Sequence, residues 1–207
     1  MIVNTSCFNK SDLADFKIYI GRFELPAHSV VLAVQSDYFR KAIQGQFVEG
    51  QNKEIRFEEG SKHAYWRAIE YMYTGSYSNE PAAVLDTKGL CFSVPPRWRL
   101  TFYTDDGEFM KDAHVYMIAN MFLVEELKHV AYRRFVSKLE RLWISETFID
   151  CIEDIYSGTA DFDQQIKDAV AKVARDHIGD LWKKKGFQDL VRQIGDFAVD
   201  LMGMVIL

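Results

Sequence analysis

The chain has 207 residues, of which 48% are hydrophobic and 27% are charged, and its formal net charge is −5. This length is enough for a domain with its own hydrophobic core, and the average composition argues against disorder along the whole chain. A mildly acidic chain lacks the positive field on which nonspecific nucleic-acid binding relies, so we expect no nucleic-acid partner.

The cysteines and the apolar runs indicate a cellular compartment. Cys7, Cys91 and Cys151 stand far apart and form no C-x-x-C pair. Such a scattered, odd set is typical of reduced thiols, which predicts a cytoplasmic or nuclear protein. The first residues show no signal-peptide pattern, and the longest apolar run, residues 201–207, is far below the roughly 20 residues that span a bilayer. We therefore expect no membrane partner.

The N-terminal part of the chain predicts short strands alternating with helices. Residues 1–14 are polar, and we expect them to be loosely held. The alternation of apolar and polar side chains on both sides of Gly21 predicts a β-hairpin. In chain order the predicted elements are strands at 16–20 and 23–25, helices at 28–34 and 37–44, a loop between Gly45 and Gly50, a strand at 53–57 and a helix from Ser61 to about Gly75.

The rest of the chain has two zones. Residues 75–107 hold three of the four prolines, and within them residues 98–103 alternate like a strand that packs on the domain, whereas residues 79–88 are expected to be mobile. From Phe109 onward apolar residues recur at helical spacing. Strands followed by a series of helices indicate an α+β fold with an α-helical extension.

The sequence contains no pattern that carries catalysis. It has no glycine-rich phosphate loop, no G-x-S-x-G and no H-E-x-x-H, and its five histidines lie in different predicted elements without ligand spacing. We therefore expect no enzyme activity, no cofactor and no metal. His28 lies where a strand passes into a helix and can bond backbone groups there, which favours a structural role.

A distinctive pattern runs from Asp15 to Phe39. It consists of an Asp, an alternating strand, a turn with glycine, a second strand that ends in Pro-Ala-His, and then Val-Leu-Ala-x-x-Ser-x-Tyr-Phe. Further matches are Phe47-Val48-Glu49, the strand around Ile55, residues 71–77 and residues 115–122 with Leu127. With these motifs the chain resembles the BTB/POZ family.

The resemblance covers most of residues 12–140, with an insert at about 75–107. Residues 141–207 are expected to form a C-terminal helical extension. Within it, Phe187-Gln188-Asp189-Leu190 and Phe197-Ala198-Val199-Asp200-Leu201 resemble the helical C-terminus of stand-alone BTB proteins that are common in filamentous fungi. The fold that the resemblance implies is therefore the BTB/POZ fold, a small sheet flanked by helices, followed by an α-helical extension.

The function that the resemblance implies is protein binding. BTB/POZ domains usually form homodimers, and many recruit a cullin scaffold for ubiquitin ligation, so a dimeric substrate adaptor is the leading expectation. In the family an apolar-x-Glu triplet before the third strand contacts the cullin, which assigns Phe47, Val48 and Glu49 to a partner surface. A second interpretation stays open for Phe47, in which its ring covers the sheet edge.

Two departures from the family pattern matter. Cullin-binding members usually end the helix after the insert in Ala-Asp-Lys-Tyr, but here the last residue is Phe122, which we assign to the partner surface without the hydroxyl. Repressor members have a basic residue after Ala-His, where this chain has Ser29.

The alternative function is a homo-oligomeric scaffold or a transcription-linked BTB protein without a ubiquitin role.

Overall fold

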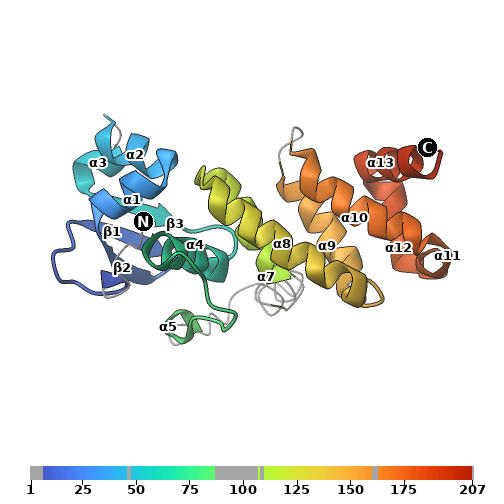
Figure 1. The fold of residues 1–207 in the computed structure, drawn as a ribbon, viewed down its shortest axis with the longest axis horizontal. Coiled ribbons are helices and arrows are strands. Elements are labelled where there is room, and N and C mark those ends of the chain that lie inside the picture. The colour runs from blue at the N-terminus through green and yellow to red at the C-terminus, as the bar shows by residue number, and fades with distance from the viewer. Residues whose placement is uncertain (1–6, 46–47, 87–106, 108–109, 160–162, 207) are drawn as a thin grey trace. The chain divides into compact units, whose positions relative to one another are not determined.

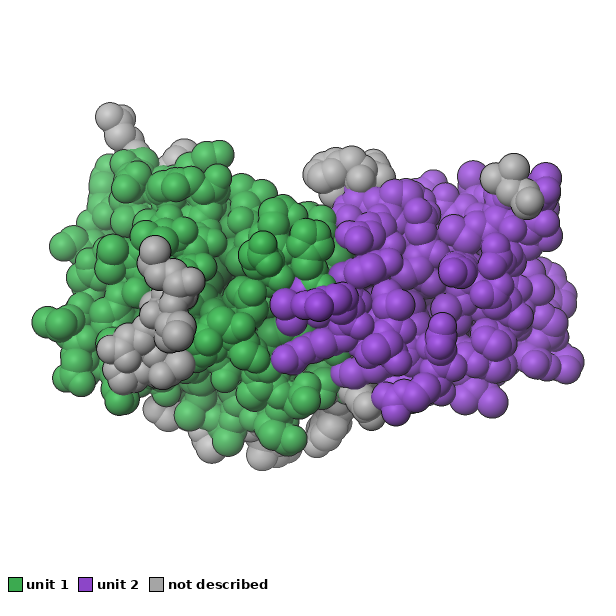
Figure 2. Space-filling view, in the orientation of Figure 1, with its two compact units in different colours: residues 1–129 green, residues 130–207 purple. Residues whose placement is uncertain are grey.

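The computed structural model describes residues 7–45, 48–86, 107, 110–159 and 163–206. The chain forms two compact units, residues 1–129 and residues 130–207 (Figure 2). The first unit contains a three-stranded sheet with helices, and the described part of the second consists of helices (Figure 1). This confirms the α+β fold followed by a helical region. The units divide within one helix at residue 129, whereas the sequence pattern placed the extension from residue 141.

The bounds of the elements are as follows. The first unit contains β1 (Phe16–Ile20), β2 (Phe23–Ala27), α1 (Ser29–Gln35), α2 (Asp37–Gln44), α3 (Val48–Asn52), β3 (Glu54–Phe57), α4 (Lys62–Thr74), α5 (Ala83–Asp86) and α7 (Met110–Met121). Next comes α8 (Glu125–Leu142), which begins in the first unit and ends in the second. The second unit continues with α9 (Thr147–Gly158), α10 (Gln164–Asp176), α11 (Ile178–Leu181), α12 (Lys185–Gln193) and α13 (Gly195–Ile206).

The sheet has the strand order β2-β1-β3, with β1 antiparallel to β2 and parallel to β3. Gly21 supplies the positive φ of +58° in the predicted hairpin turn. The second strand, predicted at 23–25, extends through Pro26 to Ala27, because an edge strand tolerates the missing N–H of a proline. Alternate side chains of β1, among them Ile18, are buried, so one face of the sheet belongs to the core.

Short-range signals in the sequence set the helix ends in the first unit. The hydroxyl of Ser36 accepts a hydrogen bond from the backbone N–H of Phe39 and caps α2, and Ser61 caps α4 in the same way. α4 ends at Gly75, which has a left-handed φ of 73°. These boundaries agree with the predicted helices.

The described part of the N-terminal segment is held against the first unit, although its polar sequence predicted a loose tail. The ring of Phe8 packs edge-on against Trp66 with the ring centroids 5.0 Å apart. The backbone carbonyl of Asp12 accepts a hydrogen bond from Nε2 of His28, 2.8 Å away. The ring of Phe8 therefore anchors this segment, although its polar composition predicted no anchor.

The first described residues of the insert are also held in place. The buried guanidinium of Arg67 in α4 donates hydrogen bonds to the backbone carbonyls of Ser78, Asn79 and Glu80, at 2.9, 3.2 and 3.2 Å. The mobility predicted from residue 79 onward therefore does not apply to these positions. The strand predicted at 98–103 lies outside the described residues.

The helices of the second unit pack around an aromatic core. Phe148 of α9, Phe187 of α12 and Phe197 of α13 are fully buried, and the last two meet edge-on with centroids 5.9 Å apart. Burial also raises the pKa of the Cys151 thiol on α9, which is a free cysteine. Within the described residues no helix combines the length and the apolar composition needed to span a bilayer.

Candidate functional site

Two of the four residues assigned to a partner surface lie on the short helix α3. The sequence predicted a loop here, and the structure forms a helix of five residues next to α2 (Figure 1). The side chain of Val48 is 66% exposed, and Glu49 is half-buried. Phe47 lies outside the described residues. An exposed valine next to a carboxylate is a suitable contact for a protein partner.

Tyr38 of α2 links α3 to the end of α7. Its ring stacks on Phe122 with a centroid distance of 5.4 Å and an interplanar angle of 28°. Burial raises the pKa of Tyr38, and the carboxylate of Glu49 raises it further. The phenol therefore stays neutral at physiological pH and remains a hydrogen-bond donor.

Phe122 is a core residue, which corrects its assignment to the partner surface. It is fully buried, and its ring contacts Phe39, Phe57 and Tyr65 at centroid distances of 4.8, 5.3 and 6.0 Å. Its backbone carbonyl accepts a hydrogen bond from the hydroxyl of Ser36, which fixes the end of α7 against α2. A side chain enclosed in this way cannot meet a partner, because the rings around it leave it no open side.

The residues on either side of Phe122 take its place on the surface. Met121 and Leu123 are exposed, Leu123 to 47%. Leu123 has a left-handed φ of 56°, because α7 ends in a Schellman motif in which the N–H of Val124 donates to the carbonyl of Ala119. Glycine is the usual residue at this position, so an exposed leucine there is held in a strained conformation.

We call the side chains of Tyr38, Val48, Glu49, Met121 and Leu123 the α2–α3 surface. The sequence pattern did not identify Tyr38, Met121 or Leu123 as members of this surface. Nothing local marks Leu123 as the C-terminal cap of α7, because the sequence has leucine where a glycine would have indicated the helix end.

A second exposed apolar face lies on α1. Val30 and Val34 are one helical turn apart and are 68% and 62% exposed. The carboxylate of Asp15 accepts hydrogen bonds from the backbone N–H of Ser29 at 2.8 Å and from its hydroxyl at 2.6 Å. Although burial opposes it, these hydrogen bonds lower the pKa of Asp15. The carboxylate is thus bound to the first turn of α1 and holds this helix in place.

His28 has the structural role that its position predicted. Its ring lies between the hydroxyl of Tyr73, 3.0 Å from Nδ1, and the backbone carbonyl of Asp12, 2.8 Å from Nε2. Because a carbonyl only accepts hydrogen bonds, Nε2 carries the hydrogen and Nδ1 accepts from the tyrosine hydroxyl. Burial raises the pKa of Tyr73 to about 12, so the hydroxyl remains a donor at physiological pH. Among the described residues no group of three or more His, Cys, Asp or Glu side chains is arranged to hold a metal ion.

Comparisons with known proteins relate the N-terminal part of the chain to a known domain family. Residues 5–94 match the model of the BTB/POZ domain. Kelch-like protein 1 of Mus musculus is 32% identical over 66 residues, which are 32% of this chain and 9% of that protein. Kelch-like protein 28 of Homo sapiens is 35% identical over 65 residues, 31% of this chain and 11% of that protein.

A third relative comes from a different group of proteins. Rho-related BTB domain-containing protein 2 of Homo sapiens is 28% identical over 75 residues, which are 36% of this chain and 10% of that protein. The chain therefore spans about a tenth of the length of these curated relatives. The similarity therefore concerns one domain of each relative, and the alignments do not include the rest of those proteins.

Proposed function

Since the chain carries a BTB/POZ domain over residues 5–94, which is a protein-interaction module, we propose that it acts as a substrate adaptor that recruits a cullin scaffold for ubiquitin ligation. The observation that carries this proposal is the exposed α3, with Val48 and Glu49 in the position where the family resemblance implies the cullin contact. Because only this domain is matched in the relatives, we propose that substrate is bound by the second unit or by another polypeptide.

The α2–α3 surface combines the two kinds of contact that such an interface needs. Val48, Met121 and Leu123 offer exposed apolar area, which a partner can bury. Glu49, next to Val48 on α3, adds a negative charge, which steers a basic partner and restricts its orientation. We propose Phe47, which directly precedes Val48 in the sequence, as the central anchor of this interface.

We expect Phe47→Ala to weaken binding of a cullin N-terminal fragment about tenfold or more, and Glu49→Gln to weaken it less. Fully burying a phenylalanine side chain stabilises a complex by roughly 1.5–3 kcal/mol, whereas an exposed charge pair contributes about 0–1 kcal/mol. The measurement is a calorimetric titration of the purified fragment into the wild type and each variant. A wild-type chain that does not bind the fragment at all would exclude the adaptor function.

Leu123→Gly separates binding from folding in the same titration. Glycine adopts the left-handed φ of this position without strain, so the variant should melt at the same temperature as the wild type or higher. It should still bind the fragment more weakly, because it removes an exposed apolar side chain from the α2–α3 surface. Equal affinity of Leu123→Gly and wild type would place the interface elsewhere on the domain.

The alternative function is a homo-oligomeric scaffold without a ubiquitin role, and the α1 face favours self-association. Two valines one turn apart are exposed on a helix whose first turn is hydrogen-bonded to Asp15. Exposed apolar pairs on a fixed helix suit a symmetric contact with a second copy, in which each copy buries the same residues. Self-association is compatible with both functions, so the cullin titration decides between them.

We expect the wild-type chain to be a dimer at micromolar concentration and the double variant Val30→Asp/Val34→Asp to be a monomer. Burying each valine contributes roughly 1.5 kcal/mol or more, so losing both raises the dissociation constant at least about 100-fold. Light scattering across a concentration series measures the change, and Val48→Asp serves as an exposed control that should leave the dimer intact. A wild type that stays monomeric at high concentration contradicts the prediction.

A further inference from the structure

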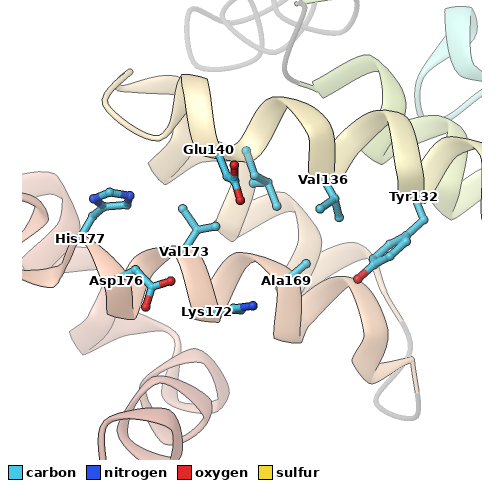
Figure 3. A pocket seen from close by; sticks show the side chains of 9 residues that line it. Tyr132, Val136, Glu140, Ala169, Lys172, Val173, Asp176 and His177 are labelled. Carbon is cyan, nitrogen blue, oxygen red and sulfur yellow. The ribbon is translucent and has the colours of Figure 1, made fainter.

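A groove of about 370 Å³ lies in the second unit between α8 and α10. Figure 3 shows that the two helices run in the same direction on either side of it. The apolar part of its lining consists of Val136 and Leu139 from α8 and of Ala169 and Val173 from α10. These side chains recur at helical spacing, so each helix presents one face to the groove over about two turns, or ~12 Å.

Two side chains of opposite charge stand on the two walls of the groove. Glu140 lies on α8 and Lys172 on α10, and both are exposed. Within the described part of the chain neither one takes part in an ion pair or a side-chain hydrogen bond. By contrast, Asp176 at the same groove is paired with Arg175 at 2.7 Å. The groove thus presents one carboxylate and one ammonium group whose hydrogen-bonding capacity is open to a ligand.

The shape and the charges of the groove restrict its occupant. Two neighbouring helix faces with an apolar trough between them match the ridge of a third helix, in which apolar side chains recur every three or four residues. An anionic or cationic surface would be attracted by one wall and repelled by the other, because Glu140 and Lys172 have opposite signs. A segment that carries both charges, one on each flank of an apolar stripe, is complementary to both walls.

We propose that the groove between α8 and α10 binds a short amphipathic helix of a partner protein. Apolar side chains of that helix at positions i and i+4 pack on Val136 and Val173. A basic residue on one flank pairs with Glu140, and an acidic residue on the other pairs with Lys172. This site is independent of the α2–α3 surface, and it would give the chain a second partner-binding site on its helical unit.

Selection from a peptide library tests the proposal. Random 12-residue peptides are displayed on phage, selected on the full chain and counterselected on Val173→Asp. We expect the enriched peptides to carry two apolar residues three or four positions apart, with a basic residue on one flank and an acidic residue on the other. If no peptide survives the counterselection, or if the survivors share no such pattern, the proposal is wrong.

Charge reversal in an enriched peptide gives the sharper result. We expect Lys172→Glu, and separately Glu140→Lys, to weaken binding of the peptide about fivefold or more, and a peptide whose acidic residue is changed to lysine to regain affinity for Lys172→Glu. Both residues are exposed, so the folded structure should not be affected. Glu153→Lys and Lys185→Glu, which are exposed on α9 and α12 away from the groove, should bind the peptide like the wild type.

The outcomes of this titration are distinct from those of the cullin experiment. Phe47→Ala is expected to bind the peptide with wild-type affinity, because it lies in the other unit. If neither charge reversal changes the affinity and the swapped peptide gains nothing, the peptide does not lie between Glu140 and Lys172, and the proposal is overturned even where cullin binding is observed.

Discussion

Replacing Phe122 by alanine is expected to destabilise the first unit by about 3–5 kcal/mol, the range for removing a fully buried aromatic ring from a core. The ring is enclosed by side chains from α2, β3 and α4, so its removal leaves a cavity that three elements would have to collapse together to fill. The same cluster positions Tyr38, and cullin binding is therefore expected to fall with stability.

Hydrogen exchange resolved by peptide fragments is the suitable measurement for Phe122→Ala, because it reports on each of the two compact units by itself. Protection in α2, β3 and α4 should fall together, while α9 and α10 keep the wild-type exchange rates. Leu13→Ala is the matched control, since it removes an apolar side chain that is 94% exposed. A loss of less than about 1 kcal/mol would show that Phe122 is not enclosed in solution.

Phe122→Tyr is not expected to tighten cullin binding in the way that the family pattern suggested. The sequence alone predicts that restoring the tyrosine hydroxyl tightens cullin binding if the residue faces the partner. In the structure the added hydroxyl would enter a cluster of aromatic rings, and burying a hydroxyl without a hydrogen-bond partner costs about 1–3 kcal/mol. The variant is therefore expected to be less stable, with no gain in affinity.

Local signals explain why much of the first unit could be predicted from the sequence. The hairpin turn at Gly21, the cap at Ser36 and the end of α4 at Gly75 each depend on residues within four positions of one another. Such signals determine where an element begins and ends. They do not determine which elements pack against each other. The BTB fold was therefore predicted from the resemblance of several motifs taken together.

The site was less predictable, because its residues come together from distant parts of the chain. Ser36 and Phe122 are 86 positions apart, yet they are joined by a hydrogen bond that fixes the end of α7 on α2. The periodicity of the helix after the insert shows that Phe122 follows an apolar stripe, but it does not show whether the ring faces the core or a partner. Leu123 carries no sequence signal of its left-handed conformation.

The buried arginine of α4 gives the second large effect. Arg67→Leu is expected to destabilise the first unit by about 2–3 kcal/mol, because leucine replaces the apolar stem but donates no hydrogen bond to the carbonyls of residues 78–80. This loss of stability is smaller than the sum expected for three buried hydrogen bonds from a charged group. The reason is that residues 78–80 are exposed, so water can reach their carbonyls. Arg67→Lys should recover only part of it, because an ammonium group cannot reach three carbonyls in the planar geometry of a guanidinium.

The region that loses protection in Arg67→Leu tests whether Arg67 holds the start of the insert in place. Limited proteolysis should cut Arg67→Leu within residues 78–86 under conditions in which the wild type resists, and hydrogen exchange should accelerate at the same residues. Arg22→Leu is the control, because Arg22 is exposed and, among the described residues, has no hydrogen bond or ion pair through its side chain. If Arg67→Leu melts lower but residues 78–86 resist protease as in the wild type, the arginine stabilises α4 rather than the insert. The tyrosine at position 77, which donates a 2.7 Å hydrogen bond to Asp112 on α7, would then be the group that ties the insert to the domain.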